Sequence, residues 1–299
     1  MSPPPPGPIY SFLQTLPLPS LPYAVQRWIP GQSPFSTHTE VFAALAAYLA
    51  IIFGGQFIMK GSKPYRFQPL FMLHNFLLSA GSGLVLALML EEIIPIIWKH
   101  GWFYSICNND AWTPRLETYY IINYYFKYWE LADTVFLVVK KKPLMFLHVF
   151  HHTATAALCY TQLNGRTSVS WVPIVANLTV HVLMYYYYFM TAAGYKIWWK
   201  KYLTTLQITQ FVIDLFIVYF ASYAYFAATY FPTWPTPGSC AGTEGAAIFG
   251  CALLTSYLFL FIAFYKKTYN AQVAAGKKKA IASKQAATKA ATSVAAKLN

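Results

Sequence analysis

Long apolar runs separated by short polar or basic connections fill most of the chain. A helix needs about 20 apolar residues to cross the hydrocarbon core of a bilayer. Runs of roughly this length or more predict helices at residues 39–58, 68–98, 117–139, 143–163, 170–194, 202–230 and 244–265. We therefore expect an all-α membrane protein built as a bundle of seven transmembrane helices.

Composition agrees with this pattern, because 57% of the residues are hydrophobic and only 10% are charged. A soluble domain with so few charges could not cover its surface. The first 35 residues are rich in proline and lack the basic start and apolar run of a cleavable signal peptide. We expect a Pro-rich luminal segment at 1–36, a transmembrane domain at 37–267 and a Lys- and Ala-rich cytosolic tail at 268–299, whose composition is typical of disorder.

Lys and Arg fall mainly on alternate connections. Cytosolic connections of membrane proteins carry an excess of these residues, which predicts a luminal N-terminus and a cytosolic C-terminus. The net charge of +13 then mostly reflects topology and contact with membrane lipid, and we expect no nucleic-acid partner. The basic connections hold Lys60, Lys63, Arg66, Lys140, Lys141, Lys142, Lys196, Lys200, Lys201, Lys266 and Lys267, whereas the others hold only Arg27, Lys99, Arg115 and Arg166.

This topology gives the four cysteines different surroundings. Cys107 and Cys240 fall on two luminal connections, while Cys159 and Cys251 lie within predicted helices. Because the lumen of the secretory pathway is oxidising, we expect a Cys107–Cys240 disulfide.

Charged residues interrupt the third apolar run, in the sequence KYWELADT. Ionisable groups inside a membrane helix are costly and are candidates for function. Lys127, Glu130, Asp133 and Thr134 project within an arc of about 120° on one helix face. A Lys–Glu pair that only fixed helix packing would leave the second carboxylate unexplained.

Histidines gather on the next two runs. His148, His151 and His152 in FLHVFHH share one face of the fourth helix, and the fifth contributes His181, with Asn177 one turn before it. The sixth begins with TTLQITQ, so that Thr204, Gln207 and Gln210 recur every third residue. A single buried histidine is usually an ordinary packing residue, which is how we interpret His38, His74 and His100, but four on two adjoining helices need another explanation.

The depth of these residues in the bilayer is consistent with one site. At about 1.5 Å per residue from the cytosolic helix ends, the two carboxylates lie ~10 to 15 Å inside, the three clustered histidines ~8 to 14 Å and His181 ~20 Å. The sequence therefore predicts a polar chamber in the cytosolic half, with His181 towards its floor.

The motifs KYWELADT, LHVFHH, HVLMYYYY and TTLQITQ, in this order and spacing, resemble those of the ELO family of very-long-chain fatty acid elongases, especially its fungal members. The resemblance runs from about Leu116 to Asp214. It implies an enzyme of the endoplasmic reticulum membrane that condenses an acyl-CoA with malonyl-CoA to give 3-ketoacyl-CoA, carbon dioxide and CoA, for very-long-chain fatty acid and sphingolipid synthesis. It further implies that the ketoreductase, dehydratase and enoyl reductase of the elongation cycle are partners, and we expect no cofactor and no metal. The dilysine retrieval signal of some relatives is absent, because the chain ends in AAKLN.

A chemical role follows for each candidate residue under this hypothesis. A neutral imidazole is a competent nucleophile, so His151 would accept the acyl group, while His181 and His152, together with His148, would handle protons or stabilise the enolate. Asp133 and Glu130 would orient the histidines of the facing helix, and Lys127 would balance their charge. The thioester or malonyl oxygens would bind Asn177, Tyr185, Tyr188, Thr204, Gln207 and Gln210, and the CoA phosphates Lys63, Arg66, Lys200, Lys201, Lys266 and Lys267. The division of labour among the histidines stays open.

Three other interpretations stay open. Soluble ketosynthases use a cysteine as acyl acceptor, and Cys159 lies on the same helix face as His152, ~10 Å further along. The sequence HVFHH is also typical of membrane di-iron desaturases and hydroxylases, although these need more ligands than this chain places on its cytosolic side. A seven-helix receptor has the same topology, but it has no reason to gather carboxylates and histidines there. No motif indicates the preferred length or unsaturation of the acyl chain. The oligomeric state is also open, and a homo-oligomer is one possibility.

Overall fold

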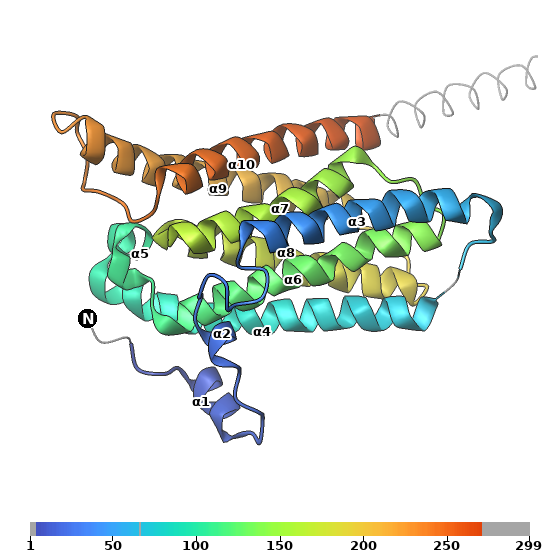
Figure 1. Cartoon of the computed structure of the whole chain (residues 1–299), viewed down its shortest axis with the longest axis horizontal. Helices are drawn as coiled ribbons and strands as arrows, with labels where there is room; N and C mark the ends of the chain where they lie inside the picture. Colours follow the sequence, from blue (N-terminus) through green and yellow to red (C-terminus); the bar gives the residue numbers. More distant parts are fainter. Residues whose placement is uncertain (1–3, 66, 271–299) are drawn as a thin grey trace, which may run out of the picture.

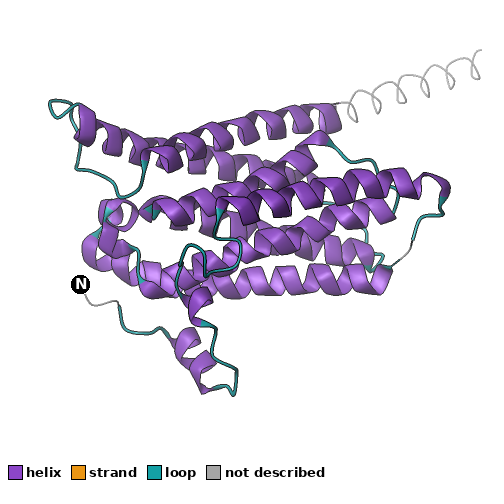
Figure 2. Ribbon diagram, viewed as in Figure 1, coloured by secondary structure: helices purple, strands orange, loops and turns teal. Residues whose placement is uncertain are grey.

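The computed structural model describes residues 4–65 and 67–270, and within them it contains helices and no strands. Arg66 and most of the predicted tail therefore lie outside the described residues. Long helices run side by side in one bundle (Figures 1 and 2). They are α3 (His38–Ile58), α4 (Gln68–His100), α6 (Pro114–Val139), α7 (Phe146–Gly165), α8 (Trp171–Ala192), α9 (Lys200–Tyr230) and α10 (Glu244–Tyr265).

Each predicted apolar run coincides with one of these long helices. The shorter helices α1 (Pro8–Thr15), α2 (Tyr23–Gln26) and α5 (Trp102–Cys107) lie near the N-terminus and in the connection between α4 and α6. Five segments are long and apolar enough to cross a membrane: His38–Gly61, Gln68–His100, Ser168–Ala192, Lys200–Tyr230 and Glu244–Tyr269. Helices α6 and α7 fall below this hydropathy because they carry the charged residues and the histidines. The chain is thus a multi-pass membrane protein, while the count of seven spans and the orientation stay predictions.

Several helix starts are set by local sequence. Thr37 and Glu40 form a capping box at the start of α3, which satisfies backbone N–H groups that have no partner within the helix. Thr113 accepts a hydrogen bond from the backbone N–H of Leu116 at the start of α6, where Pro114 occupies the first turn.

The start of the fourth predicted helix needs a correction. We expected Pro143 in its first turn, but α7 begins at Phe146. Lys141 adopts a left-handed backbone conformation with φ of 54°, which ends α6. Lys142 precedes a proline, a position that disfavours helical backbone, so the chain passes Pro143 before the next helix begins.

The largest buried apolar cluster lies toward the end of the bundle that carries α5. Its members come from α3 to α9 and from connections such as the one that holds Cys240, and Leu116, Ile121, Tyr124 and Leu178 have no measurable exposure. The helix pairs α4 with α8, α9 with α10 and α6 with α7 pack along their lengths. This end of the bundle is therefore closed by tightly packed side chains.

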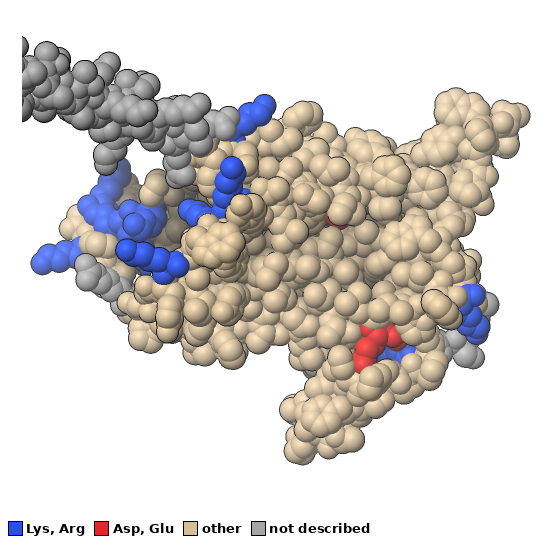
Figure 3. Space-filling model, turned by 180° about the vertical axis from the view of Figure 1, so that it is seen from behind, with Lys and Arg blue, Asp and Glu red and all other residues tan. Residues whose placement is uncertain are grey.

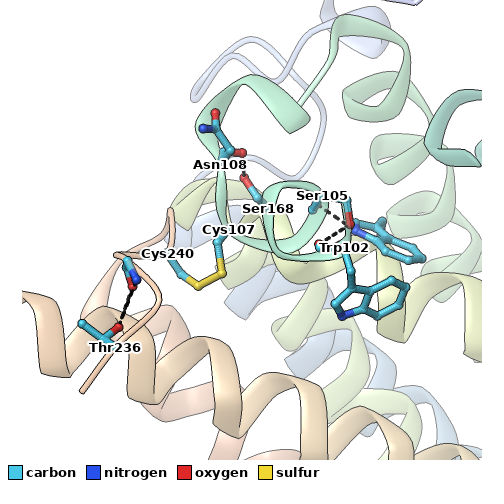
Figure 4. Close-up of a disulfide and its surroundings, with 9 residues drawn as sticks. Trp102, Ser105, Cys107, Asn108, Ser168, Thr236 and Cys240 are labelled. Carbon is cyan, nitrogen blue, oxygen red and sulfur yellow. Dashed lines mark hydrogen bonds between the residues drawn. A yellow bond between two sulfur atoms is a disulfide. The ribbon is translucent and has the colours of Figure 1, made fainter. Parts of the chain in front are cut away.

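A disulfide between Cys107 and Cys240 ties α5 to the connection between α9 and α10 (Figure 4). This is the pair expected from the predicted topology. The backbone N–H of Ala241 donates to the carbonyl oxygen of Cys107 at 2.7 Å, and Ser168 Oγ donates to the carbonyl oxygen of Asn108 at 2.8 Å. The disulfide thus holds several connections together at one end of the bundle.

The Pro-rich N-terminal segment packs on the bundle through two acids. Glu91 of α4 accepts hydrogen bonds from the backbone N–H groups of Ile9 and Tyr10. Glu117 of α6 accepts from the backbone N–H of Trp28 at 2.9 Å and pairs with Arg27 at 3.2 Å. Side-chain carboxylates therefore hold this segment, although α1 itself projects from the bundle (Figure 1).

Basic side chains gather at the opposite end of the bundle (Figure 3). They come from the connections that the sequence assigns to the cytosol. The exposed ones are Lys60, Lys63, Lys141, Lys142, Lys196, Lys200, Lys201, Lys266 and Lys267.

Candidate active site

A buried ion pair on α6 forms one part of the site. Lys127 Nζ lies 2.9 Å from Glu130 Oε1 and donates to Asn177 Oδ1 of α8 at 2.8 Å. His181 Nδ1, one turn after Asn177, lies 3.1 Å from the same Glu130 oxygen, although it is not aligned for a hydrogen bond. Removing either charge would leave the other unpaired in the interior, so these four side chains form one network between α6 and α8.

Asp133 forms a second network, with partners that the sequence did not predict. Its Oδ1 lies 2.7 Å from His74 Nε2 of α4, and its Oδ2 accepts a hydrogen bond from the hydroxyl of Tyr185 of α8 at 2.7 Å. We expected both acids of α6 to orient the histidines of the facing helix, α7. Instead Glu130 pairs with His181 and Asp133 with His74, neither of which lies on α7.

Thr134 makes the contact from α6 to α7. Successive residues on a helix point about 100° apart, so Thr134 faces α7 while Asp133 faces α4 and α8. His148 Nε2 lies 3.0 Å from Thr134 Oγ1, which also accepts a hydrogen bond from the hydroxyl of Tyr48 of α3 at 2.7 Å. The ring of His152 lies 4.4 Å from that of His148.

His151 has different surroundings from its neighbours. Its ring lies 4.8 Å from that of Tyr257 and also packs near Phe211 and Phe261. The hydroxyl of Tyr257 donates to the carbonyl oxygen of His151 at 3.2 Å, which holds the backbone of α7 against α10. His151 Nδ1 is buried and has no hydrogen-bond partner among the described residues.

Two cavities share this histidine in their lining. The wider one, of about 1230 Å³ including the space at its opening, is lined by Asp133 and the histidines of α7 and α8. The other, of about 810 Å³ measured in the same way, runs between mostly apolar side chains such as Leu158, Val218 and Leu254. Both are lined by His151, Asn177, Gln210 and Phe211. We call them the polar chamber and the apolar cavity.

The structure brings most of the predicted residues to these two cavities. Lys127 and Cys159 line the apolar cavity. Glu130 and Tyr185 are buried and contact residues of the wall. The polar chamber is lined by the predicted residues Asp133, His148, His151, His152, Asn177, His181, Tyr188, Gln207 and Gln210.

Other predicted residues lie elsewhere. Thr204 lines neither cavity, since its hydroxyl pairs with that of Tyr269 at 3.2 Å, near the start of α9. Thr204 is buried, but its hydroxyl faces the segment Lys266–Asn270 that follows α10 and not the polar chamber. The lysines assigned to CoA phosphates, Lys63, Lys200, Lys201, Lys266 and Lys267, are exposed at the basic end and line neither cavity.

Sequence reasoning missed three residues near the site. The rule that polar groups in membrane helices are candidates for function would have selected His74 and Asp214. Asp214 is fully buried and accepts a hydrogen bond from Gln210 Nε2 at 3.0 Å. Tyr257 lies in an apolar stretch, where no sequence signal distinguishes it from a packing residue.

No three His, Cys, Asp or Glu side chains in residues 4–65 and 67–270 are arranged to bind a metal ion together. The rings of the α7 cluster have other neighbours: His148 contacts Thr134, and His151 packs against Tyr257.

Comparison with known proteins gives consistent matches over most of the chain. The family model described as "ELO: GNS1/SUR4 family" matches residues 33–279. "Putative fatty acid elongase 1" of Schizosaccharomyces pombe is 50% identical over 258 residues, which cover 84% of this chain and 77% of that protein. "Fatty acid elongase A" of Dictyostelium discoideum is 35% identical, with 84% of this chain and 91% of that protein covered. "Long chain fatty acid elongase 2" of Caenorhabditis elegans is 31% identical, with coverage of 76% and 82%.

Proposed function

The chain belongs to the ELO (GNS1/SUR4) family of fatty acid elongases, and from this we propose that it catalyses the condensing step of elongation. In this reaction a long-chain acyl-CoA and malonyl-CoA give a 3-ketoacyl-CoA two carbons longer, carbon dioxide and free CoA. The names of the relatives state fatty acid elongation and no more, so the condensation reaction and its mechanism are our proposal.

In the first half-reaction His151 is the nucleophile. An imidazole nitrogen attacks the thioester carbonyl, the C–S bond breaks, and CoA leaves as a thiolate that takes up a proton. The acyl group is then held as an acyl-imidazole, which is a reactive donor.

In the second half-reaction malonyl-CoA loses carbon dioxide, and the electron pair of the broken C–C bond forms an enolate. The enolate carbon attacks the acyl-imidazole, the new C–C bond forms, and the C–N bond to the histidine breaks. The released nitrogen takes up a proton from water, which restores the neutral imidazole. The reaction balances without any oxidant, reductant or cofactor.

The position of His151 is the single observation that carries this proposal. It lines both the polar chamber and the apolar cavity, so a thioester carbonyl beside it could have its acyl chain among apolar side chains and its CoA in the chamber. The length of the apolar cavity would then limit the length of the product.

The surrounding groups suit the charges that develop. His181 contacts Glu130 through Nδ1, which leaves its Nε2 for the enolate oxygen or for a proton. Lys127 offsets the charge of Glu130 in the interior. His148 and His152 complete the chamber wall and are the candidates for proton transfer.

The same proposal includes orientation and location. Seven spans with a cytosolic basic end would bring the anionic CoA to the exposed lysines at the chamber side of the bundle (Figure 3). We place the protein in the membrane of the endoplasmic reticulum, with the ketoreductase, dehydratase and enoyl reductase of the cycle as partners and with products used for very-long-chain fatty acids and sphingolipids.

Purified protein in detergent tests the chemistry. With radiolabelled malonyl-CoA, a saturated acyl-CoA and no reductant, we expect a labelled 3-ketoacyl-CoA. His151→Ala should lower the rate by roughly 10³-fold or more, as loss of a nucleophile does. The control is His100→Ala, because His100 stacks on Tyr104 and lines neither cavity.

A trapping experiment tests the order of the steps. Acyl-CoA alone should release one CoA per active site and label the protein, and His151→Ala should do neither. Turnover that survives this substitution, or an adduct located on Cys159, would contradict the proposed nucleophile.

A further inference from the structure

The carboxylate of Asp133 is largely buried in the chamber wall and needs a positively charged partner. Lys127 and Glu130 balance one another, but Asp133 has no Lys or Arg partner among the described residues. A buried carboxylate is costly unless a counter-charge lies beside it. The group in that position is His74, whose Nε2 lies 2.7 Å from Asp133 Oδ1.

We propose that His74 is the counter-ion of Asp133: as an imidazolium it keeps the carboxylate ionised and fixed in the wall of the polar chamber. His74 is 6% exposed and reaches Asp133 from α4. With Tyr185 donating to the other carboxylate oxygen at 2.7 Å, both oxygens of Asp133 are held. His74 is therefore a positioning residue that acts through Asp133.

Three aromatic rings pack around His74. The rings of Phe136, Trp129 and Tyr185 approach it at 5.1, 6.2 and 6.4 Å between centroids, each steeply inclined to the imidazole. The titratable or charged groups around Asp133 come from five helices: Tyr48 of α3, His74 of α4, Lys127 and Glu130 of α6, His148 and His152 of α7, and His181, Tyr185 and Tyr188 of α8.

The consequence for catalysis rests on the proposed function. Acylation of a neutral imidazole by a thioester develops positive charge on the ring. A fixed carboxylate in the wall of the same chamber stabilises that charge without having to reorganise. Without its counter-ion, Asp133 would take up a proton and lose this effect, so His74→Gln should behave like Asp133→Asn.

Infrared spectroscopy tests the ion pair independently of activity. The C=O stretch of a protonated buried carboxyl group should be absent at the Asp133 position in the wild type and should appear in His74→Gln. It should disappear again in His74→Gln/Asp133→Asn, which identifies its source, and His100→Gln on the same helix is the matched control. An unchanged carboxyl region in His74→Gln would overturn the proposal even if the protein were inactive as an elongase.

Kinetics provide the second test. We expect His74→Gln and Asp133→Asn each to lower kcat by roughly 10- to 100-fold with little change in KM, and the double variant to be no slower than either single one. The rate of His74→Gln should recover partly as pH rises, since higher pH restores the ionised carboxylate, and the double variant should show no such recovery. Effects that multiply in the double variant, or wild-type rates in His74→Gln at every pH, would show that His74 does not act through the charge of Asp133. His74→Gln keeps the size and donor of the side chain, and thermal unfolding in detergent would establish that it folds.

Discussion

Glu130 shares one carboxylate oxygen between Lys127 on its own helix and His181 on α8, and each of these side chains is almost fully buried. The cost of placing the charges there is offset only while the cation and the anion are both present. The same pair fixes how α6 and α8 face each other, because Lys127 also donates to Asn177. These few atoms are therefore expected to stabilise the fold, and under the proposed function they also form the wall of the site.

Removing one partner of this pair should be costly. Glu130→Gln should lower the free energy of unfolding by about 3 to 5 kcal/mol, because Lys127 is then a buried charge without a counter-ion. Thermal and denaturant unfolding in detergent measures the loss. Glu130→Gln/Lys127→Met removes both charges and should regain most of the stability without regaining condensation. If Glu130→Gln were as stable as the wild type, water would have to reach and solvate the charge of Lys127.

At the scale of the helices, the disulfide joins segments that are 133 residues apart in the sequence. A cross-link of this span restricts the unfolded chain, and the loop-closure model assigns it about 4 to 5 kcal/mol. Cys240→Ser should therefore lower the thermal midpoint clearly, and reductant should lower that of the wild type but not that of the variant. Cys251→Ser, which removes a free cysteine, is the control. Equal midpoints would show that packing alone holds this end together.

The elements and the site were predictable to different degrees. Apolar runs located every long helix because crossing a bilayer imposes one minimum length. Helical spacing and depth also placed the residues of α6, α7 and α8 around one chamber. Spacing within one helix does not state which neighbouring helix each face meets, so it missed the contact of His74 on α4 with Asp133. The predicted start of α7 at residue 143 was also wrong. The left-handed conformation of Lys141 and the proline at 143 keep the chain non-helical until Phe146.

At the scale of the whole molecule, the distribution of charge predicts which end meets the cytosol. In sealed microsomes a membrane-impermeant maleimide should label Lys142→Cys directly, and Lys99→Cys only after detergent is added. Both side chains are exposed, at opposite ends of the bundle, and the unsubstituted protein gives the background. Direct labelling of Lys99→Cys would reverse the proposed orientation.

The apolar cavity beside His151 has a consequence for the protein at rest. A space of about 810 Å³ lined largely by apolar side chains would accept a hydrocarbon tail, and the surrounding bilayer supplies such tails. Under the proposed function, lipid or detergent tails would compete with the acyl chain of the substrate, and the apparent affinity for an acyl-CoA would depend on the lipid or detergent present. A bound lipid or detergent tail would have to leave the cavity before the acyl chain of a substrate could bind there.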